Sequence, residues 1–545
     1  MIQTLLDLWD YWRKNRISMI LPLGIFCPLA AFGLLSLLKV PEPIQLHNFT
    51  ASEHPGRITY ETVHTGEYQS DLAAWIGDAF CGHNVLLKSY NQLKYSVLKE
   101  ASGDCMVGKE GYLYSKSQTA AWAAGSHSNN IRVVEYEEYA KQIKSLQDLL
   151  EKRGKSFLFL LNPVKAEVCA DHLPAKYLFL ADQYADTEES IVPMLERALD
   201  KYGVNYFDTT DFLRSMNEGG KIQVFHNTGH HWTLDAVVAA LNECFQSCKI
   251  ALGNIDIPEI RIQGNRDETF EVDLDIYDLQ NLFWGIRDKE YHTPNITYDH
   301  MSQNNVFLFG TSFGYEIERV LHQSGSNRAF NRIVSYRYFT NKHILDESGM
   351  RELPFTSEQD ISELGIMEDI KESNFVILEQ NNIFGVADTH KRWVEYVVKN
   401  MSEQFYAAGT DIMAKENSEL ADFENFSWQE DWGRWGEGNE NLISVYSNGK
   451  LLRGEGGMLR FQALSYGEDY VCDVLFNENK IGTIVLGTAP EDYQIEIPEE
   501  YILKDRNDIT FRLHGKVLSP DERGESGDTR KLGLGLCSLM IEEVE

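Results

Sequence analysis

The stretch V-F-L-F-G-T-S-F-G (Val306–Gly314) decides the fold class of this 545-residue chain. Its apolar first half predicts a buried strand, and residues 310–314 predict a tight turn directly after it. A hydroxyl group on such a turn would lie at the carboxyl end of the strand, where open α/β sheets usually place their sites. Ser312 is therefore the first candidate for a nucleophile.

Helical and apolar strand patterns alternate on both sides of this stretch. An amphipathic helix is predicted over residues 136–150 and a buried strand over 156–161. The alternation continues with helices at 191–202, 234–245, 315–322 and 394–404 and strands at 205–207 and 375–379. Such alternation predicts an α/β fold with a doubly wound, mostly parallel sheet.

The amino-acid composition changes after residue 425, where Trp, Glu and Gly become frequent. Short alternating strands are predicted over residues 459–464, 470–476, 483–486, 493–497 and 509–513. A segment of roughly 120 residues with this pattern has the size of one domain. Residues 425–545 are therefore predicted to form an all-β, jelly-roll-like sandwich.

The N-terminal part contains an uncharged apolar segment, Ile17–Leu38, which is long enough to cross a bilayer as a helix. Arg13, Lys14 and Arg16 precede it and favour a cytoplasmic N-terminus. A cleaved signal peptide is the alternative, although its apolar core would be shorter. Residues 1–40 are predicted to be a cytoplasmic N-terminus with a single-pass anchor in the cell membrane, and residues 41–104 a spacer with covering helices, so that the main domains are extracytoplasmic.

Composition restricts the partners. The formal net charge of −33 argues against nucleic acid, since phosphate binding needs clustered Lys and Arg. No sequence spacing supplies three converging metal ligands. The eight cysteines are too few for a disulfide scaffold. Cys81 could pair with Cys105 and Cys472 with Cys537 in an exported domain, or all could stay unpaired.

The stretch F-H-N-T-G-H-H-W-T (Phe225–Thr233) supplies a base for the nucleophile. A hydroxyl group reacts at neutral pH only when a base removes its proton, and imidazole is the usual base. His231 is the best candidate for that role. A third group, usually a carboxylate, holds such an imidazole in the right tautomer.

Four blocks in this order resemble a known family. They are G-K-E-G-Y-L-Y at 108–114, N-P-V-K-A-E at 162–167 with Leu173-Pro174, G-H-H-W at 229–232, and G-T-S-F at 310–313. Together the blocks resemble the exported SGNH-like polysaccharide O-acetyltransferases of the AlgJ/AlgX type and the related DHHW proteins. The likeness covers roughly residues 105–400 and predicts an SGNH-like domain over 105–410.

The resemblance implies an activity and its residues. It implies a membrane-anchored O-acetyltransferase that modifies a secreted or cell-surface polysaccharide through an acetyl-serine intermediate. The nucleophile falls on Ser312, the catalytic histidine on His231 and a structural aromatic residue on Trp232. No cofactor is implied, and a membrane-bound acyltransferase is implied as the partner that delivers the acetyl group. The C-terminal sandwich resembles carbohydrate-binding modules of extracellular glycan enzymes.

Two positions depart from the family pattern. The catalytic aspartate falls on Gly229, and the acidic residue before the nucleophile falls on Thr311. Loss of the orienting carboxylate can cost on the order of 10⁴ in turnover. His226 or Asn227 could replace it by a neutral hydrogen bond, Asp208 or Asp211 could reach in, or a Ser-His dyad could suffice. The alternatives to a transferase are a catalytically inactive glycan-binding scaffold of an exopolysaccharide machine and an acetyl esterase.

Overall fold

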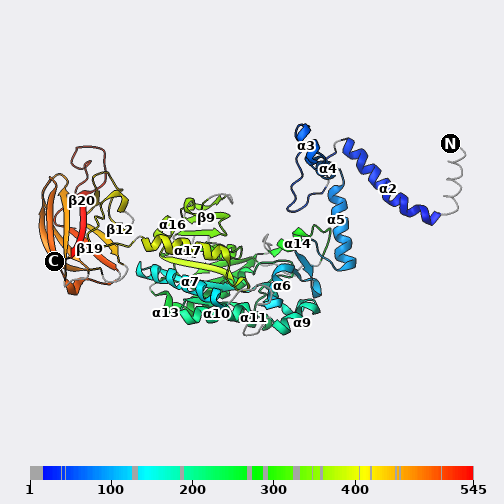
Figure 1. Ribbon diagram of the computed structural model, residues 1–545, viewed down its shortest axis with the longest axis horizontal. Helices are drawn as coiled ribbons and strands as arrows, with labels where there is room; N and C mark the ends of the chain where they lie inside the picture. The colour runs from blue at the N-terminus through cyan, green and yellow to red at the C-terminus, as the bar shows by residue number, and fades with distance from the viewer. Residues whose placement is uncertain are drawn as a thin grey trace.

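A computed structural model shows three successive parts along the chain: N-terminal helices, a central α/β domain and a C-terminal β-sandwich (Figure 1). The structure describes residues 16–543 except 39, 43, 126–132, 185–189, 254, 267–272, 286–292, 323–331, 347, 356–359, 404, 418–419, 448–450, 453–455 and 505. The N-terminal helices lie at one end of the molecule and the sandwich at the other.

The described residues of the N-terminal part form the helices α2 (Arg16–Leu37), α3 (Tyr60–Thr65), α4 (Glu67–Ala79) and α5 (His83–Leu93), followed by a π-helical turn at Lys94–Leu98. Helices α4 and α5 lie where the sequence predicts covering helices. In the described part of the chain, no helix combines the length and the apolar character needed to cross a membrane. The membrane anchor therefore stays a prediction.

The α/β domain is built on a seven-stranded sheet in the order β10-β9-β8-β7-β11-β3-β4. Its strands are β3 (Ser156–Asn162), β4 (Tyr206–Asp208), β7 (Asn305–Gly310), β8 (Arg332–Arg337), β9 (Asn341–Asp346), β10 (Gly349–Pro354) and β11 (Phe375–Asn381). Strands β8, β7, β11, β3 and β4 are parallel, and β9 and β10 extend the sheet antiparallel. The predicted mostly parallel sheet is confirmed.

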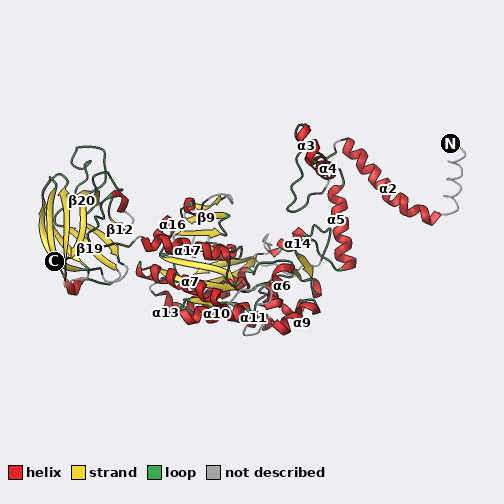
Figure 2. Ribbon diagram, viewed as in Figure 1, coloured by secondary structure: helices red, strands yellow, loops and turns green. Residues whose placement is uncertain are grey.

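Helices cover both faces of this sheet (Figure 2). Because successive side chains of a strand point to opposite faces, Leu308 belongs to one hydrophobic core and its neighbours Phe307 and Phe309 to the other. The first core is closed by α8 (Lys165–Val168), α11 (Thr210–Glu218), α12 (Leu234–Ser247) and α15 (Gly314–His322). The second is closed by α7 (Val133–Lys152), α10 (Ile191–Tyr202), α16 (Ile366–Glu372) and α17 (Asp388–Glu403). The central strands read as continuous apolar runs because both of their faces are buried.

Smaller elements surround the sheet. They are the hairpins β1 (Cys105–Val107) with β2 (Leu113–Ser115) and β5 (Ile260–Arg266) with β6 (Thr293–Tyr298), and the helices α6 (Lys116–Ala124), α9 (Ala175–Tyr184), α13 (Lys249–Leu252) and α14 (Asp275–Leu279).

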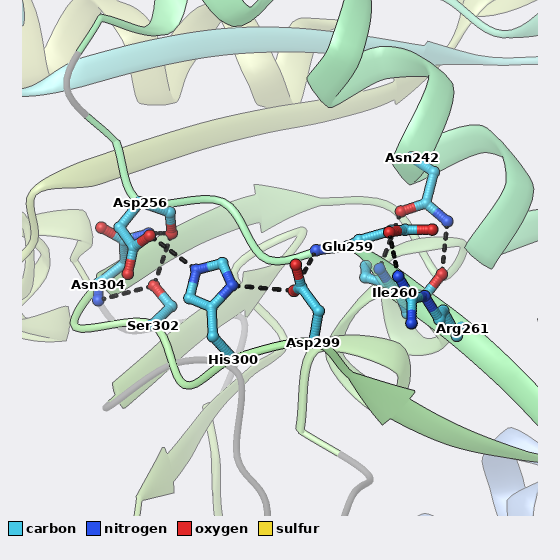
Figure 3. A network of polar contacts seen from close by, with 9 residues as sticks. All are labelled: Asn242, Asp256, Glu259, Ile260, Arg261, Asp299, His300, Ser302 and Asn304. Carbon is cyan, nitrogen blue, oxygen red and sulfur yellow. Dashed lines mark hydrogen bonds and ion pairs between the residues drawn. The ribbon is translucent and has the colours of Figure 1, made fainter.

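A polar network fixes the segment that leads from the β5–β6 hairpin into β7 (Figure 3). The His300 ring lies between two carboxylates, with Nε2 2.8 Å from Asp256 Oδ1 and Nδ1 2.9 Å from Asp299 Oδ1. Ser302 Oγ and Asn304 Nδ2 donate to the backbone carbonyl of Asp256, each at 2.7 Å. These bonds set the entry of strand β7, which carries the nucleophile turn at its other end.

The C-terminal part is a sandwich of two antiparallel sheets, β12-β14-β19-β16-β17 and β13-β20-β15-β18. Its strands are β12 (Ala421–Glu424), β13 (Arg434–Glu437), β14 (Glu440–Tyr446), β15 (Gly456–Ser465), β16 (Tyr470–Phe476), β17 (Asn479–Leu486), β18 (Glu491–Pro498), β19 (Arg506–Leu513) and β20 (Leu532–Glu543). The all-β region is confirmed. Its core includes Tyr406, Ile412 and Met413, and β12 begins at Ala421, so the packed unit starts before residue 425.

None of the eight cysteines, which all lie in the described part of the chain, forms a disulfide bond. The pairings of Cys81 with Cys105 and of Cys472 with Cys537 are therefore not formed, and Cys81, Cys105 and Cys472 are buried as small apolar side chains.

Candidate active site

Ser312 lies on the turn between β7 and α15, at the carboxyl end of a central parallel strand. The turn is closed by the backbone N–H of Gly314, which donates to the carbonyl of Thr311 at 3.1 Å, and by that of Tyr315, which donates to the carbonyl of Ser312 at 3.2 Å. The side chain of Ser312 is half-buried, whereas Thr311 and Phe313 on either side are buried. The turn thus presents one hydroxyl group to the surface.

His231 meets this hydroxyl group from the loop that precedes α12. Its Nε2 lies 2.8 Å from Ser312 Oγ. The neighbouring Trp232 is fully buried, and its indole N–H donates to the backbone carbonyl of Phe313 at 3.2 Å. That bond ties the histidine loop directly to the nucleophile turn, so the two stretches singled out in the sequence meet in space.

A third side chain, Asp275 at the start of α14, completes the arrangement. Its Oδ2 lies 2.7 Å from His231 Nδ1. Its other oxygen, Oδ1, accepts the backbone N–H groups of His230 at 2.7 Å and of Ile276 at 2.6 Å. Both carboxylate oxygens are therefore fixed, one of them on the imidazole.

The contacts of His231 determine its tautomer. An ionised carboxylate accepts hydrogen bonds only, so Nδ1 of His231 must donate its proton to Asp275. Nε2 then carries a lone pair, and Ser312 Oγ–H donates to it. The neighbouring His230 is kept neutral, because burial lowers its pKa to about 4. One base therefore faces the hydroxyl group.

An open pocket of about 600 Å³ lies beside the base and its carboxylate. His231 and Asp275 line it, with side chains 14% and 23% exposed. Polar side chains also line the pocket, namely Asp104 before β1, Ser115 of β2, and Ser117 and Gln118 of α6. The base is thus accessible from solvent, and Ser312, which its Nε2 contacts, is half-buried.

The substitutes expected for the missing aspartate are not used. Asp208 and Asp211 line a separate cavity of about 170 Å³, where Asp208 accepts bonds from Thr210 and Asn382. His226 lies 3.6 Å from Asp273, and the Asn227 carbonyl accepts from Leu113 N–H and Lys165. A Ser-His dyad is also wrong, since Asp275 occupies the second ring nitrogen.

Sequence reasoning missed Asp275 because its position carries no local motif. It follows His231 by 44 residues and lies in a short helix with the sequence D-I-Y-D-L. The sequence indicates only that a carboxylate from elsewhere in the chain is needed to orient His231.

The N-terminal segment holds α14 in place. Asn91 Nδ2, from α5, donates to the carbonyl of Gln280 at 2.9 Å, and Gln92 Oε1 accepts the backbone N–H of Phe283 at 3.0 Å. Ile276 and Tyr277 of α14 pack in a small core with Tyr95 and Leu113. Residues that precede the α/β domain therefore hold the helix that carries the carboxylate of Asp275.

Lys165 fixes the loop that carries His231. Its ammonium is buried and donates to four backbone carbonyls, those of Leu113 at 2.8 Å, His226 at 2.6 Å, Asn227 at 3.0 Å and Gly229 at 2.8 Å. The ammonium thus joins β2, α8 and the histidine loop, which explains a lysine in the second sequence block.

We expect Lys165→Met to destabilise the α/β domain by about 3 kcal/mol, because it leaves several buried carbonyls without their charged donor. Thermal unfolding should then begin about 6 to 12 °C lower. Differential scanning calorimetry measures this shift. Lys221→Met is the matched control, since Lys221 is exposed. Equal unfolding temperatures for the two variants would contradict the role of Lys165.

Part of the α/β domain matches a known family. Residues 105–244 match the family described as "SGNH hydrolase-like domain, acetyltransferase AlgX". The matched range includes Lys165, His231 and Trp232, three of the residues that build the site. No curated protein matches the chain.

Several solved structures resemble parts of the chain. The O-acetyltransferase domain of Pseudomonas putida AlgJ is 15% identical, with 54% of this chain and 99% of that chain covered and a TM-score of 0.34. Pseudomonas aeruginosa AlgX is 12% identical, with 84% and 93% covered and a TM-score of 0.34. The CBM36-1 domain of a multidomain xylanase from the hindgut metagenome of Trinervitermes trinervoides is 11% identical, with 23% and 98% covered and a TM-score of 0.15.

The likeness to this family lies in the match over residues 105–244 and in the order of the four sequence blocks. The predicted resemblance is confirmed: residues 105–244 resemble an SGNH hydrolase-like domain of the AlgX acetyltransferase type.

Proposed function

We propose that this protein is an extracytoplasmic O-acetyltransferase that acetylates a secreted or cell-surface polysaccharide through acetyl-Ser312. The observation that carries the proposal is the continuous hydrogen-bonded chain from Ser312 Oγ through His231 to Asp275 at an open pocket. In that chain Ser312 is the nucleophile, His231 the general base and Asp275 the group that orients the base.

The first half-reaction forms the acetyl-enzyme. As Ser312 Oγ attacks the carbonyl carbon of an acetyl ester, its proton passes to His231 Nε2, and the negative charge of the tetrahedral intermediate moves to the former carbonyl oxygen. Within the described residues, no acceptor contacts the backbone N–H of Ser312, so this group is free to donate to that oxygen. The C–O bond to the leaving alcohol then breaks, and His231 returns the proton to the alcohol.

The second half-reaction reverses these roles. A sugar hydroxyl group gives its proton to His231 Nε2 while its oxygen attacks acetyl-Ser312, and the proton returns to Ser312 Oγ when the acetyl ester of the sugar leaves. Asp275 stabilises the imidazolium in both half-reactions. No cofactor takes part in either step.

The pocket rim suits a sugar acceptor. Asp104 accepts from Ser115 Oγ at 2.7 Å and from Ser117 Oγ at 2.6 Å, which aligns hydroxyl and carboxylate groups beside His231. Such groups exchange hydrogen bonds readily with sugar hydroxyls. The overall net charge of −33 favours a polymer that is not strongly anionic.

The location and the donor belong to the same proposal. The apolar segment Ile17–Leu38 would anchor the protein in the cell membrane with its domains outside. A membrane-bound acyltransferase would then deliver the acetyl group. The location can be checked by protease accessibility of the sandwich in intact cells, with and without detergent.

The test of the function uses an activated acetyl ester with a soluble oligosaccharide acceptor. A transferase yields acetylated oligosaccharide, whereas an acetyl esterase yields free acetate in the same amount with and without acceptor. A glycan-binding scaffold without activity yields neither. The scaffold alternative rests on Gly229 and on the β-sandwich; the contact of Asp275 with His231 supplies the carboxylate that is absent at position 229 and therefore favours the transferase.

The sandwich would add a second contact with the polymer. Trp428 is 64% exposed, and the guanidinium of Arg530 lies 4.1 Å from the centre of its ring. Trp432, Trp435 and Tyr466, which are half-buried, form an aromatic cluster in the same sandwich, with ring centres 5.0 and 5.5 Å apart. An exposed ring such as that of Trp428 can stack on the apolar face of a sugar. We therefore assign carbohydrate binding to this end of the sandwich.

We expect Trp428→Ala to weaken binding of the polymer by about tenfold, which corresponds to the loss of one stacking contact of about 1.4 kcal/mol. Affinity electrophoresis against a panel of soluble polysaccharides measures the change. Trp284→Ala is the matched control, because Trp284 is similarly exposed but lies in the α/β domain. Identical retardation of the two variants in every gel would rule the surface out.

A further inference from the structure

A buried carboxylate, Glu379, lies directly behind the nucleophile turn. It belongs to β11, the strand next to β7, and is fully buried. Its Oε2 accepts the backbone N–H of Thr311 at 2.7 Å, and the Thr311 hydroxyl lies 3.0 and 2.9 Å from its two oxygens. Asn162 Nδ2, from the end of β3, donates to Oε1 at 2.8 Å. Three strands therefore meet at this carboxylate.

Glycine at position 310 makes this approach possible. A Cβ atom on Gly310 would lie 2.5 Å from Glu379 Oε2, and one on Gly314 would lie 3.7 Å from the same oxygen. Any side chain at position 310 would therefore displace the carboxylate. The space that Glu379 occupies thus explains why position 310, two residues before Ser312, is glycine.

The Thr311 side chain extends the effect of Glu379 across the turn. Its hydroxyl donates to Glu379 and accepts the backbone N–H of Phe313 at 3.1 Å. The N–H groups of Thr311 and Phe313 are therefore both engaged on the side away from the pocket. This leaves the N–H of Ser312 between them as the one that can serve the reaction.

The position of Glu379 is unfavourable for stability. Burial raises the pKa of Glu379 to about 7, although its hydrogen bonds from Thr311 and Asn162 lower it. In the part of the chain that the structure describes, no Lys or Arg forms a salt bridge with it, and its hydrogen-bond partners are Thr311 and Asn162. A buried carboxylate without a cation weakens a fold, so its presence calls for another role.

We propose that Glu379 is a positioning residue, which acts through Thr311 to fix the backbone on both sides of Ser312 and so directs the Ser312 N–H and hydroxyl group into the pocket. The inference rests on the proposed function of Ser312 as nucleophile. Glu379 itself does not contact the substrate; it lowers the barrier by holding the oxyanion donor in place before the reaction.

The test moves the carboxylate from position 379 to position 311. Glu379→Gln is expected to lower kcat for p-nitrophenyl acetate by about 10² with KM little changed, since the loss of one preorganised donor costs about that much. Thr311→Asp alone is expected to lower kcat too, because it places two buried carboxyl groups in contact. The double variant Glu379→Gln with Thr311→Asp restores one carboxylate and is expected to recover kcat to within about tenfold of the native value.

Thermal unfolding of each variant separates positioning from folding. A residue with a merely structural role would lower the unfolding temperature and leave the kcat of the folded fraction unchanged. Glu138→Gln, on the exposed face of α7, controls for the chemical change. Thr311→Val removes only the hydroxyl link and serves if Glu379→Gln does not fold; it is expected to lower kcat about tenfold.

Two results would overturn the inference. One is native kcat in folded Glu379→Gln, or in Thr311→Val where Glu379→Gln does not fold, and the other is a double variant no better than the worse single variant. Either result would leave Ser312 as nucleophile untouched, because that role is tested separately by trapping the acetyl-enzyme. If Ser312→Ala keeps full activity, it is the proposed function that fails.

Discussion

Ser312→Ala should lose acetyl-ester turnover by a factor on the order of 10³ or more, because the hydroxyl oxygen that accepts the acetyl group is removed. The loss is expected in kcat, since the pocket and the remaining hydrogen-bond donors stay in place. Release of p-nitrophenol from p-nitrophenyl acetate measures it. In acid-quenched native enzyme, mass spectrometry should also find an acetyl group on the peptide that contains Ser312.

The control for Ser312→Ala makes the same chemical change elsewhere. Ser145 lies on the exposed face of α7, where its hydroxyl group bonds only to the carbonyl of Lys141. Ser145→Ala should therefore keep the native rate. Slow release at the same rate from native protein and from Ser312→Ala would mean that the chain is not a serine-dependent acyl-transfer enzyme.

Asp275→Asn should lower kcat by about 10³ to 10⁴, equivalent to about 4 to 5.5 kcal/mol of barrier. The amide can still accept the N–H groups of His230 and Ile276, so the structure is kept. Its NH₂ group, however, favours the wrong tautomer of His231 and does not stabilise the imidazolium. Steady-state kinetics on the same ester measure the change in kcat and KM.

Asp278→Asn is the matched control for this variant. Asp278 lies on the same helix, and its carboxylate faces His47 at 4.0 Å rather than the site. Gly229→Asp tests the same assignment from the other side: since Asp275 already holds Nδ1 of His231, a second carboxylate should bring no gain. A strong rise in activity from Gly229→Asp would show that Asp275 does not orient the base.

Much of the fold was predictable because the apolar patterns have a direct physical cause. Strand β7 and helix α10 lie within one residue of their predicted bounds, since a continuous apolar run and a clean helical period each have one favourable placement. The β9–β10 extension was not predicted. Strand β10 is mostly exposed and therefore lacks the apolar pattern of a buried strand.

The site was predictable only in part for the same reason. Ser312 and His231 lie in stretches whose local sequence suits a tight turn and a fixed loop, whereas Asp275 and Glu379 reach the site by tertiary packing. The likeness to a family pointed to position 229 for the acid, and the chain fills that space from α14 instead. A group needed at one point in space can come from any segment that passes nearby.

Residues that precede the α/β domain hold α14 in place, so the support of the catalytic site includes part of the N-terminal segment. Asn91 and Gln92 hold the helix that carries Asp275, so a chain shortened to begin at residue 105 would keep its sheet and its serine but lose the support of its acid. A displacement of α5 would be transmitted through these bonds to the carboxylate beside His231. Turnover would then respond to a change at α5 without any rearrangement of the sheet.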